Sequence, residues 1–226
     1  MTLPTPTLGR RVASEAIGTA LLLAGVVGSG IMAERLSGGN AGLALLANAV
    51  ATGGVLFALI VAFGPISGAH FNPVVTLALA SRGMLPRRDI AVYLAAQIPG
   101  AIAGVWLAHL MFALPILQAS TKVRSGIGQW SAEVVATFGL VLLILLGARR
   151  ETPSLPAAVA VYIVSAYWFT ASTSFANPAV TIARALSDTF AGIAPVDAPA
   201  FIVAQCVGAG MAVLVTRFLD GRPERN

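Results

Sequence analysis

Charged residues and cysteine are both scarce in this sequence. Only 10% of its 226 residues are charged and 57% are hydrophobic, whereas an ordinary soluble domain is roughly 25% charged. The single cysteine, Cys206, excludes a disulfide or a thiolate metal site within one chain. His70 has no Cys, Asp or second His near it, so neither a metal site nor another cofactor is expected. These features indicate an integral membrane protein.

Long apolar stretches divide the chain into candidate membrane spans. Crossing the hydrocarbon takes about 20 residues, and six stretches meet that length: residues 12–33, 42–63, 90–113, 130–148, 156–172 and 199–219. The first has no small-residue cleavage site behind a short apolar core, so we interpret it as a retained helix and not a signal peptide. Two shorter apolar pieces, 72–81 and 177–186, are left over.

The basic residues follow the expected topology. The pI near 10.3 suggests a nucleic-acid partner, but the basic residues form no single patch, so none is expected. If the N-terminus is cytoplasmic, ten arginines lie inside and four basic residues outside, a positive-inside bias that places both termini in the cytoplasm. The inner set is Arg10, Arg11, Arg82, Arg87, Arg88, Arg149, Arg150, Arg217, Arg222 and Arg225; the outer set is Arg35, Lys122, Arg124 and Arg184.

The sequence contains an internal repeat. "SEAIGTALLL" is echoed by "AEVVATFGLVLL", "HFNPVVTLALA" by "FANPAVTIARA", and "YLAAQIPGAIAG" by "FIVAQCVGAGMA". The matched landmarks are Glu15 with Glu133, Asn72 with Asn177, and Gln97 with Gln205. We interpret residues 1–226 as a single channel domain, with a first repeat at 10–113 and a second at 130–219. Each repeat holds three spans, an odd number, so the second repeat is inverted in the membrane.

The two short apolar pieces each begin with an Asn-Pro pair. Asn is a strong N-cap and Pro is favoured at the first helical position. Ten helical residues span roughly 15 Å, about half of the hydrocarbon, so each piece is predicted to be a re-entrant half-helix. Asn72 and Asn177 should then meet near mid-membrane, where non-helical backbone needs protein or a water-filled cavity around it. The sequence therefore predicts a pore.

Two glutamates lie deep inside predicted spans, and an intramembrane carboxylate is a functional candidate by default. Glu15 and Glu133 either serve a proton-coupled transporter or a membrane enzyme, or accept hydrogen bonds from backbone N–H groups of the re-entrant loops. We favour the loop-supporting role, because the two repeat-related loops each need one such acceptor. The chain has no Gly-x-Ser-x-Gly or His-Glu-x-x-His, and an enzyme is not expected.

The boxes "SGAHFNPVVT" and "SFANPAVT", with the two glutamates, resemble the aquaporin, or major intrinsic protein, family over about residues 10–220. The resemblance implies an all-α membrane protein with six transmembrane helices and two re-entrant half-helices. It also implies a homotetramer with one pore per subunit, in a bacterial inner membrane. His70 is either a pore-lining donor or a loop side chain, and the resemblance favours pore lining.

The selectivity filter departs from the pattern of water-selective members. In those members an arginine follows the second Asn-Pro-Ala, whereas this chain has Val180. Counting without gaps from the boxes places the other filter positions at Thr52, Ser165 and Ser174, where relatives carry a large aromatic, a histidine and a small residue. Small uncharged side chains at four positions imply a wider and less polar constriction.

Two points near the filter stay open in the sequence. A slip of one or two residues would replace Ser165 by Ala166 or Tyr167. Arg184 either charges the outer mouth or snorkels to the outer interface, and we expect snorkelling. The loop 114–129 either covers the pore mouth or only connects two spans, and we favour the connector.

The leading hypothesis is a passive channel for small uncharged solutes and some water, its membrane partner being the lipid bilayer. Candidate solutes are glycerol-like polyols, urea-sized molecules and neutral metalloid acids such as arsenite. The alternatives are a water-selective aquaporin and a proton-coupled secondary transporter, since inverted repeats and broken helices also occur in transporters.

Overall fold

The computed structural model describes residues 5–220, and within them all regular secondary structure is helical, without a strand. In chain order the elements are α1 (Leu8–Leu36), α2 (Ala41–Ser67), α3 (Pro73–Ser81), the 3-10 helix η1 (Arg87–Asp89), α4 (Ile90–Met111), α5 (Ile127–Arg149), α6 (Leu155–Phe169), α7 (Pro178–Arg184) and α8 (Ala198–Leu219). The predicted all-α membrane fold is confirmed. Arg222 and Arg225, which were counted in the charge bias, lie outside the described residues.

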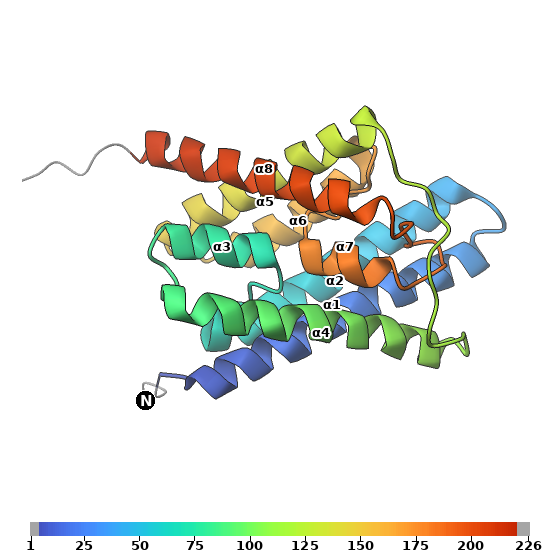
Figure 1. Ribbon diagram of the computed structural model, residues 1–226, viewed down its shortest axis with the longest axis horizontal. Coiled ribbons are helices and arrows are strands. Elements are labelled where there is room, and N and C mark those ends of the chain that lie inside the picture. Colours follow the sequence, from blue (N-terminus) through green and yellow to red (C-terminus); the bar gives the residue numbers. More distant parts are fainter. Residues whose placement is uncertain (1–4, 221–226) are drawn as a thin grey trace, which may run out of the picture.

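The two predicted half-helices are present and lie nearly end to end among the long helices (Figure 1). Helix α3 has nine residues and α7 has seven, and each begins at the proline of its Asn-Pro pair. We call the end of the bundle where α1 begins and α8 ends the terminal side, and the opposite end the loop side. Helix α3 lies on the terminal side and α7 on the loop side (Figure 1).

The fifth predicted span, which forms α6, is shorter than predicted. Within residues 5–220, five helices are long and apolar enough to cross a membrane, whereas α6 has only 15 residues, or about 22 Å of helix. It ends at Phe169 because Thr170 adopts an extended conformation, with φ −115° and ψ 134°. The predicted stretch 156–172 therefore overran the helix by three residues. This early end sets which α6 side chains face the interior.

Glycines bring the helix backbones of each repeat close together. A Cβ added at Gly100 of α4 would lie 2.5 Å from the carbonyl oxygen of Ala16 on α1. The repeat-related contact is Gly208 of α8, where a Cβ would lie 2.4 Å from the carbonyl oxygen of Val134 on α5. Small residues allow such close packing in lipid. The same helix crossing thus occurs in both repeats, as the internal repeat predicts.

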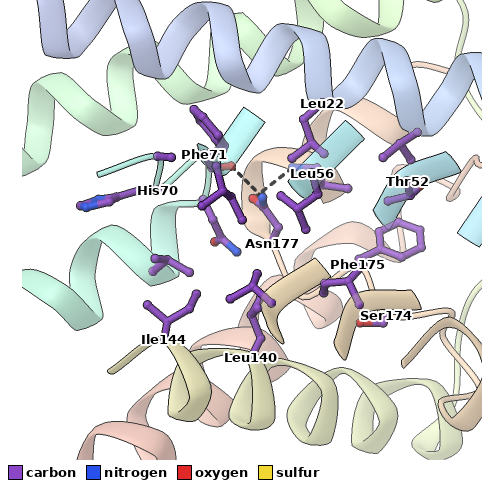
Figure 2. Close-up of a pocket in the computed structure, with 18 of the residues that line it drawn as sticks. Leu22, Thr52, Leu56, His70, Phe71, Leu140, Ile144, Ser174, Phe175 and Asn177 are labelled. Atoms are coloured by element: carbon purple, nitrogen blue, oxygen red, sulfur yellow. Dashed lines mark hydrogen bonds between the residues drawn. The ribbon is translucent and has the colours of Figure 1, made fainter. Parts of the chain in front are cut away.

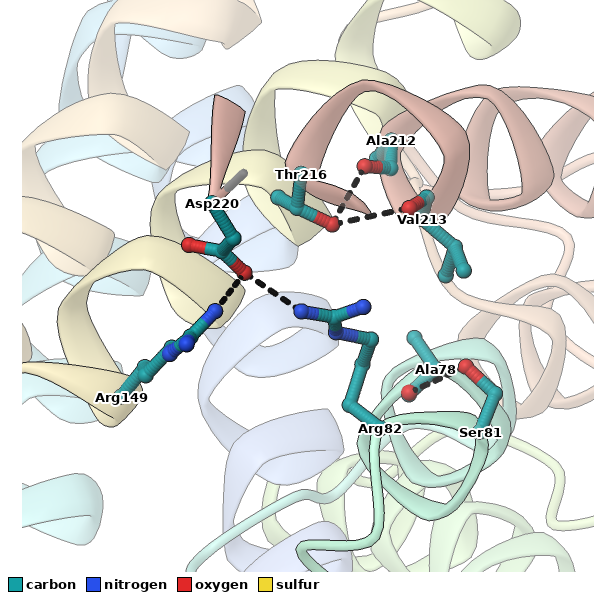
Figure 3. Close-up of polar contacts among 8 residues, drawn as sticks. All are labelled: Ala78, Ser81, Arg82, Arg149, Ala212, Val213, Thr216 and Asp220. Carbon is teal, nitrogen blue, oxygen red and sulfur yellow. Dashed lines mark hydrogen bonds and ion pairs between the residues drawn. The ribbon is translucent and has the colours of Figure 1, made fainter. Parts of the chain in front are cut away.

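An ion-pair cluster on the terminal side ties α8 to both repeats. The Asp220 carboxylate contacts the guanidinium groups of Arg82, just after α3, and Arg149, at the end of α5 (Figure 3). Arg11 of α1 pairs with Asp89 at 2.9 Å. The Asp220 contacts anchor the terminal end of the half-helix α3 to α5 and α8, and the Arg11–Asp89 pair joins α1 to the start of α4.

Candidate functional site: a conduit along the half-helices

A cavity of about 120 Å³ runs along the two half-helices. Since one water needs roughly 10–15 Å³ measured in this way, the space holds several water molecules. Its wall is mostly aliphatic. Polar lining side chains fall in three groups along its length. His70 lies towards the terminal side, Asn177 at the centre, and Thr52 and Ser174 towards the loop side (Figure 2). Asn72 joins the central group through its bond to the second loop, and Tyr167, next to Thr52, and Arg184, at the end of α7, join the loop-side group.

The two box asparagines link the half-helices to each other. Each Oδ1 caps its own half-helix by accepting from the amide of the second residue after it, at 3.1 Å for Asn72 and 2.9 Å for Asn177. The Nδ2 of Asn72 donates to the carbonyl oxygen of Ala176 at 2.8 Å. The Nδ2 of Asn177 donates to the carbonyl oxygen of Phe71, also at 2.8 Å (Figure 2). Each Nδ2 carries a second hydrogen. The sequence did not predict that one donor of each amide holds the opposite loop.

The loops that lead into the half-helices have matching strained backbones. Ala69 and Phe71 have φ values of 50° and 49°, and Ser174 and Ala176 have 50° and 48°. These positions lie three and one residues before the asparagine in each repeat. A left-handed conformation costs roughly 1–2 kcal/mol for a residue other than glycine. The loops therefore need strong fixed partners.

Two buried carboxylates supply those partners. Glu15 accepts from the backbone amides of His70 and Phe71 at 3.0 and 2.8 Å. Glu133 accepts from the amides of the two residues before Asn177, at 2.9 Å each. Both glutamates are completely buried, and neither lines the cavity. This geometry corresponds to the loop-supporting role.

Gln97 and Gln205 extend the support and were missed as functional positions. The Gln97 amide donates to the Glu15 carboxylate at 2.8 Å and to the hydroxyl of Thr76 on α3 at 2.9 Å. Gln205 makes the equivalent pair of bonds in the second repeat, at 2.6 and 2.9 Å. Their place as matched landmarks of the repeat was the signal that pointed to a shared role. Each glutamine connects a long helix, a glutamate and a half-helix.

The filter position assigned to Ser165 is wrong. Ser165 is exposed on the outside of α6 and its hydroxyl donates to the carbonyl oxygen of Val161 at 2.9 Å. Tyr167 lines the cavity instead, with its hydroxyl 3.3 Å from that of Thr52. A shift of two residues turns a helix position by about 200°, so an ungapped count that errs by two selects the opposite face. Thr52, Ser174 and Val180 do line the cavity.

Arg184 does not snorkel to the interface. It is only 2% exposed, lines the cavity, and donates through Nε to the carbonyl oxygen of Ala191. Its guanidinium carbon lies 3.4 Å from the centroid of the Phe175 ring, a cation–π contact. The reason is that α7 ends at Arg184 and the following residues, 185–197, fold back over it.

The loop between α4 and α5 is more than a connector. Arg124 of this loop is buried and donates to the carbonyl oxygens of Ser172 at 3.2 Å and Gly192 at 2.8 Å. Burial lowers the pKa of the Arg124 guanidinium. The arginine thus ties the loop to the segments before and after α7. It stabilises the loop-side end of the conduit.

A bundle of membrane-length helices around a conduit, with two opposed half-helices at its centre, defines a transmembrane channel. The sequence model described as "Major intrinsic protein" matches residues 2–168. The chain belongs to the major intrinsic protein family. It is an integral membrane protein and a passive channel for small neutral solutes and water, not an enzyme, as predicted.

Known proteins resemble the chain over most of its length. It is 56% identical to "Aquaglyceroporin AqpS" of Rhizobium meliloti, across 94% of this chain and 91% of the relative. It is 28% identical to "Aquaporin Z" of Brucella melitensis biotype 1, across 94% of this chain and 98% of the relative. The solved aquaglyceroporin of Plasmodium falciparum has a TM-score of 0.66 at 23% identity and covers 92% of this chain and 95% of its own, which supports the fold alone.

Proposed function

We propose that this channel preferentially conducts small uncharged solutes with several hydroxyl groups, together with some water. Glycerol-like polyols, urea-sized molecules and neutral metalloid acids such as arsenite are the candidate solutes. The observation that carries this proposal is Val180, which lines the cavity beside Thr52 and Ser174 where water-selective members carry a narrowing arginine. The name of the Rhizobium relative, an aquaglyceroporin, supports the same solute class.

The centre of the conduit accounts for the neutrality of the solutes. The N-termini of α3 and α7 meet there, and each helix N-terminus carries roughly half a positive charge. This is the barrier described for aquaporin-type channels, in which half-helix dipoles oppose cations and protons. The second Nδ2 hydrogens of Asn72 and Asn177 serve as donors to a passing solute oxygen. His70 lines the terminal-side half of the same path.

The two alternatives account less well for the site. A proton-coupled carrier needs a titrating carboxylate that the solute reaches, but Glu15 and Glu133 are fully buried away from the cavity and engaged with backbone amides. A strict water channel resembling the water-selective members would have an arginine at position 180, where Val180 contributes two methyl groups to the wall instead. Flux measurements distinguish the three functions: water flux without solute flux would indicate a water channel, and flux that follows a pH difference would indicate a carrier.

The membrane setting follows from the charge bias. The arginines counted as cytoplasmic that lie within residues 5–220 are at or near helix ends on the terminal side. We therefore assign the terminal side and both termini to the cytoplasm of a bacterial inner membrane. The large exposed apolar side chains of the long helices contact lipid. The family resemblance supports a homotetramer with one pore per subunit.

The test is the substitution Val180→Arg in proteoliposomes. The added side chain narrows the conduit and places a charge in it, so stopped-flow rates for glycerol and arsenite should fall by roughly tenfold, more than the rate for water. Val196→Arg is the matched control, because Val196 is exposed on the loop side and outside the cavity lining. Unchanged glycerol and arsenite rates in properly folded Val180→Arg channels would overturn the proposal.

A further inference from the structure

Arg184 lies in the loop-side part of the conduit. It brings a positive charge to this part, where the residue after the second Asn-Pro-Ala, Val180, is uncharged. The two residues are four positions apart, about one turn of α7, and therefore lie on the same face. Both line the cavity. A positive side chain is thus present near the constriction, displaced by one turn towards the loop side.

Most N–H donors of the Arg184 guanidinium are not used by hydrogen bonds to the described protein residues. An arginine has five N–H donors, and the Nε donor is used by the carbonyl oxygen of Ala191. Within residues 5–220, Nη1 and Nη2 have no hydrogen-bond acceptor and no carboxylate partner, yet neither is sealed from the cavity. The contact with the Phe175 ring fixes the plane of the group. The free edge of the fork is therefore available to a solute.

Ser174 provides an independent sign of a ligand. Its side chain is 3% exposed and lines the cavity, and in the described part of the chain its Oγ has no hydrogen-bond partner. Buried polar side-chain atoms are usually paired. Because Ser174 lines the conduit, rotation about its χ1 bond brings this unpaired hydroxyl to a passing molecule. The neighbouring hydroxyls of Thr52 and Tyr167, 3.3 Å apart, add further polar atoms at this level.

Arg124 and Phe175 hold this arrangement in place. The guanidinium carbon of Arg124 lies 5.0 Å from the centroid of the same Phe175 ring that contacts Arg184. Arg124 also binds the carbonyl oxygen of Ser172, two residues before Ser174. The two arginines and the aromatic ring fix the loop that carries the unpaired hydroxyl. The site is therefore built into the fold and not left on a free surface.

We propose that Arg184 and Ser174 form the solute-recognition site of this channel, in the space that the small side chain of Val180 leaves open. The Nη groups donate to solute oxygens while the Ser174 hydroxyl donates or accepts, which fits a neutral molecule with hydroxyls on adjacent atoms. The positive charge of Arg184, with that of Arg124 on the same Phe175 ring, also repels cations and hydrated protons entering from the loop side. This inference rests on the proposed conduction of hydroxylated solutes.

The test compares the ratio of glycerol to water permeability in stopped-flow proteoliposome assays. Ser174→Ala should lower that ratio roughly fivefold, the value of about 1 kcal/mol for one hydrogen bond. Arg184→Leu should lower it roughly tenfold or more, because bonds to a charged group are stronger. Arg184→Lys, which keeps the charge without the planar fork, should fall in between. Arg35→Leu is the control, because Arg35 lies on the loop side but outside the cavity lining.

The outcomes separate this inference from the proposed function. If wild-type vesicles show no glycerol flux above empty liposomes, the proposed function fails and the inference fails with it. If the wild type conducts glycerol but Ser174→Ala and Arg184→Leu keep the wild-type ratio within twofold, the inference alone is wrong. Ser174→Ala removes one oxygen that has no described protein partner, so a purely structural role for Ser174 predicts no change.

Discussion

The glutamate that supports the second loop can be tested by a substitution of nearly equal size, Glu133→Gln. In the structure the carboxylate accepts three hydrogen bonds, from the amides of Phe175 and Ala176 at 2.9 Å and from Gln205 at 2.6 Å. A glutamine places an NH₂ group where one acceptor oxygen was, so at least one buried donor then faces another donor. The perturbation thus removes an acceptor without creating a cavity.

The expected cost follows from those bonds. Losing one hydrogen bond to a charged group, with its buried N–H left unpaired, costs about 1.5–3 kcal/mol, so the free energy of unfolding should fall by that amount. For a chain of this length that lowers the melting temperature by on the order of 10 °C. Circular dichroism of the detergent-solubilised protein during heating measures the shift.

Glu34→Gln is the matched control for this experiment. Glu34 is exposed near the end of α1, so its substitution should leave the melting temperature within about a degree of the wild type. Glycerol flux through Glu133→Gln should also fall, because the loop that carries Ser174 loses its anchor. A variant that melts and conducts like the wild type would refute the loop-supporting role of the carboxylate.

Two further predictions concern the packing of the bundle. Gly104→Ala should destabilise the protein by about 1–3 kcal/mol, because the new Cβ would lie 2.1 Å from the carbonyl oxygen of Ala20. Gly54→Ala is the control in thermal melting, because a Cβ there has nothing within 4 Å. Equal melting temperatures for the two variants would contradict the close crossing of α1 and α4. Asp220→Asn weakens the contacts with Arg82 and Arg149, so it should cost about 1–2 kcal/mol at low salt and less at high salt. Melting at two salt concentrations checks this, and the absence of any salt-dependent difference from the wild type would show that the cluster contributes nothing.

The features predicted correctly from the sequence are those that local chemistry and the repeat determine. Asn-Pro starts a helix through capping and a fixed φ, so Asn72 and Asn177 identified the half-helices without tertiary information. The odd number of spans in each repeat then required the half-helices to approach from opposite sides. Glu15 and Glu133 were identified because an acidic residue deep in a span needs a partner.

The misplaced residues depend on backbone geometry that the sequence pattern does not encode. Ser165 and Tyr167 differ by about 200° around α6, and the choice between them depends on where α6 ends and how residues 170–177 reach the second box. The position of Arg184 depends on the segment 185–197, which covers the end of α7 through contacts with the distant loop that carries Arg124. Neither relationship has a local sequence signal.

The most direct test of the central claim, a passive conduit past Asn72 and Asn177, is solute flux through the wild-type protein in proteoliposomes. Stopped-flow rates for water, glycerol, urea and arsenite gradients should exceed those of empty liposomes. They should rise linearly with the gradient and should not change when a pH difference is imposed. Flux that saturates and follows the pH difference would contradict the account and indicate a coupled carrier.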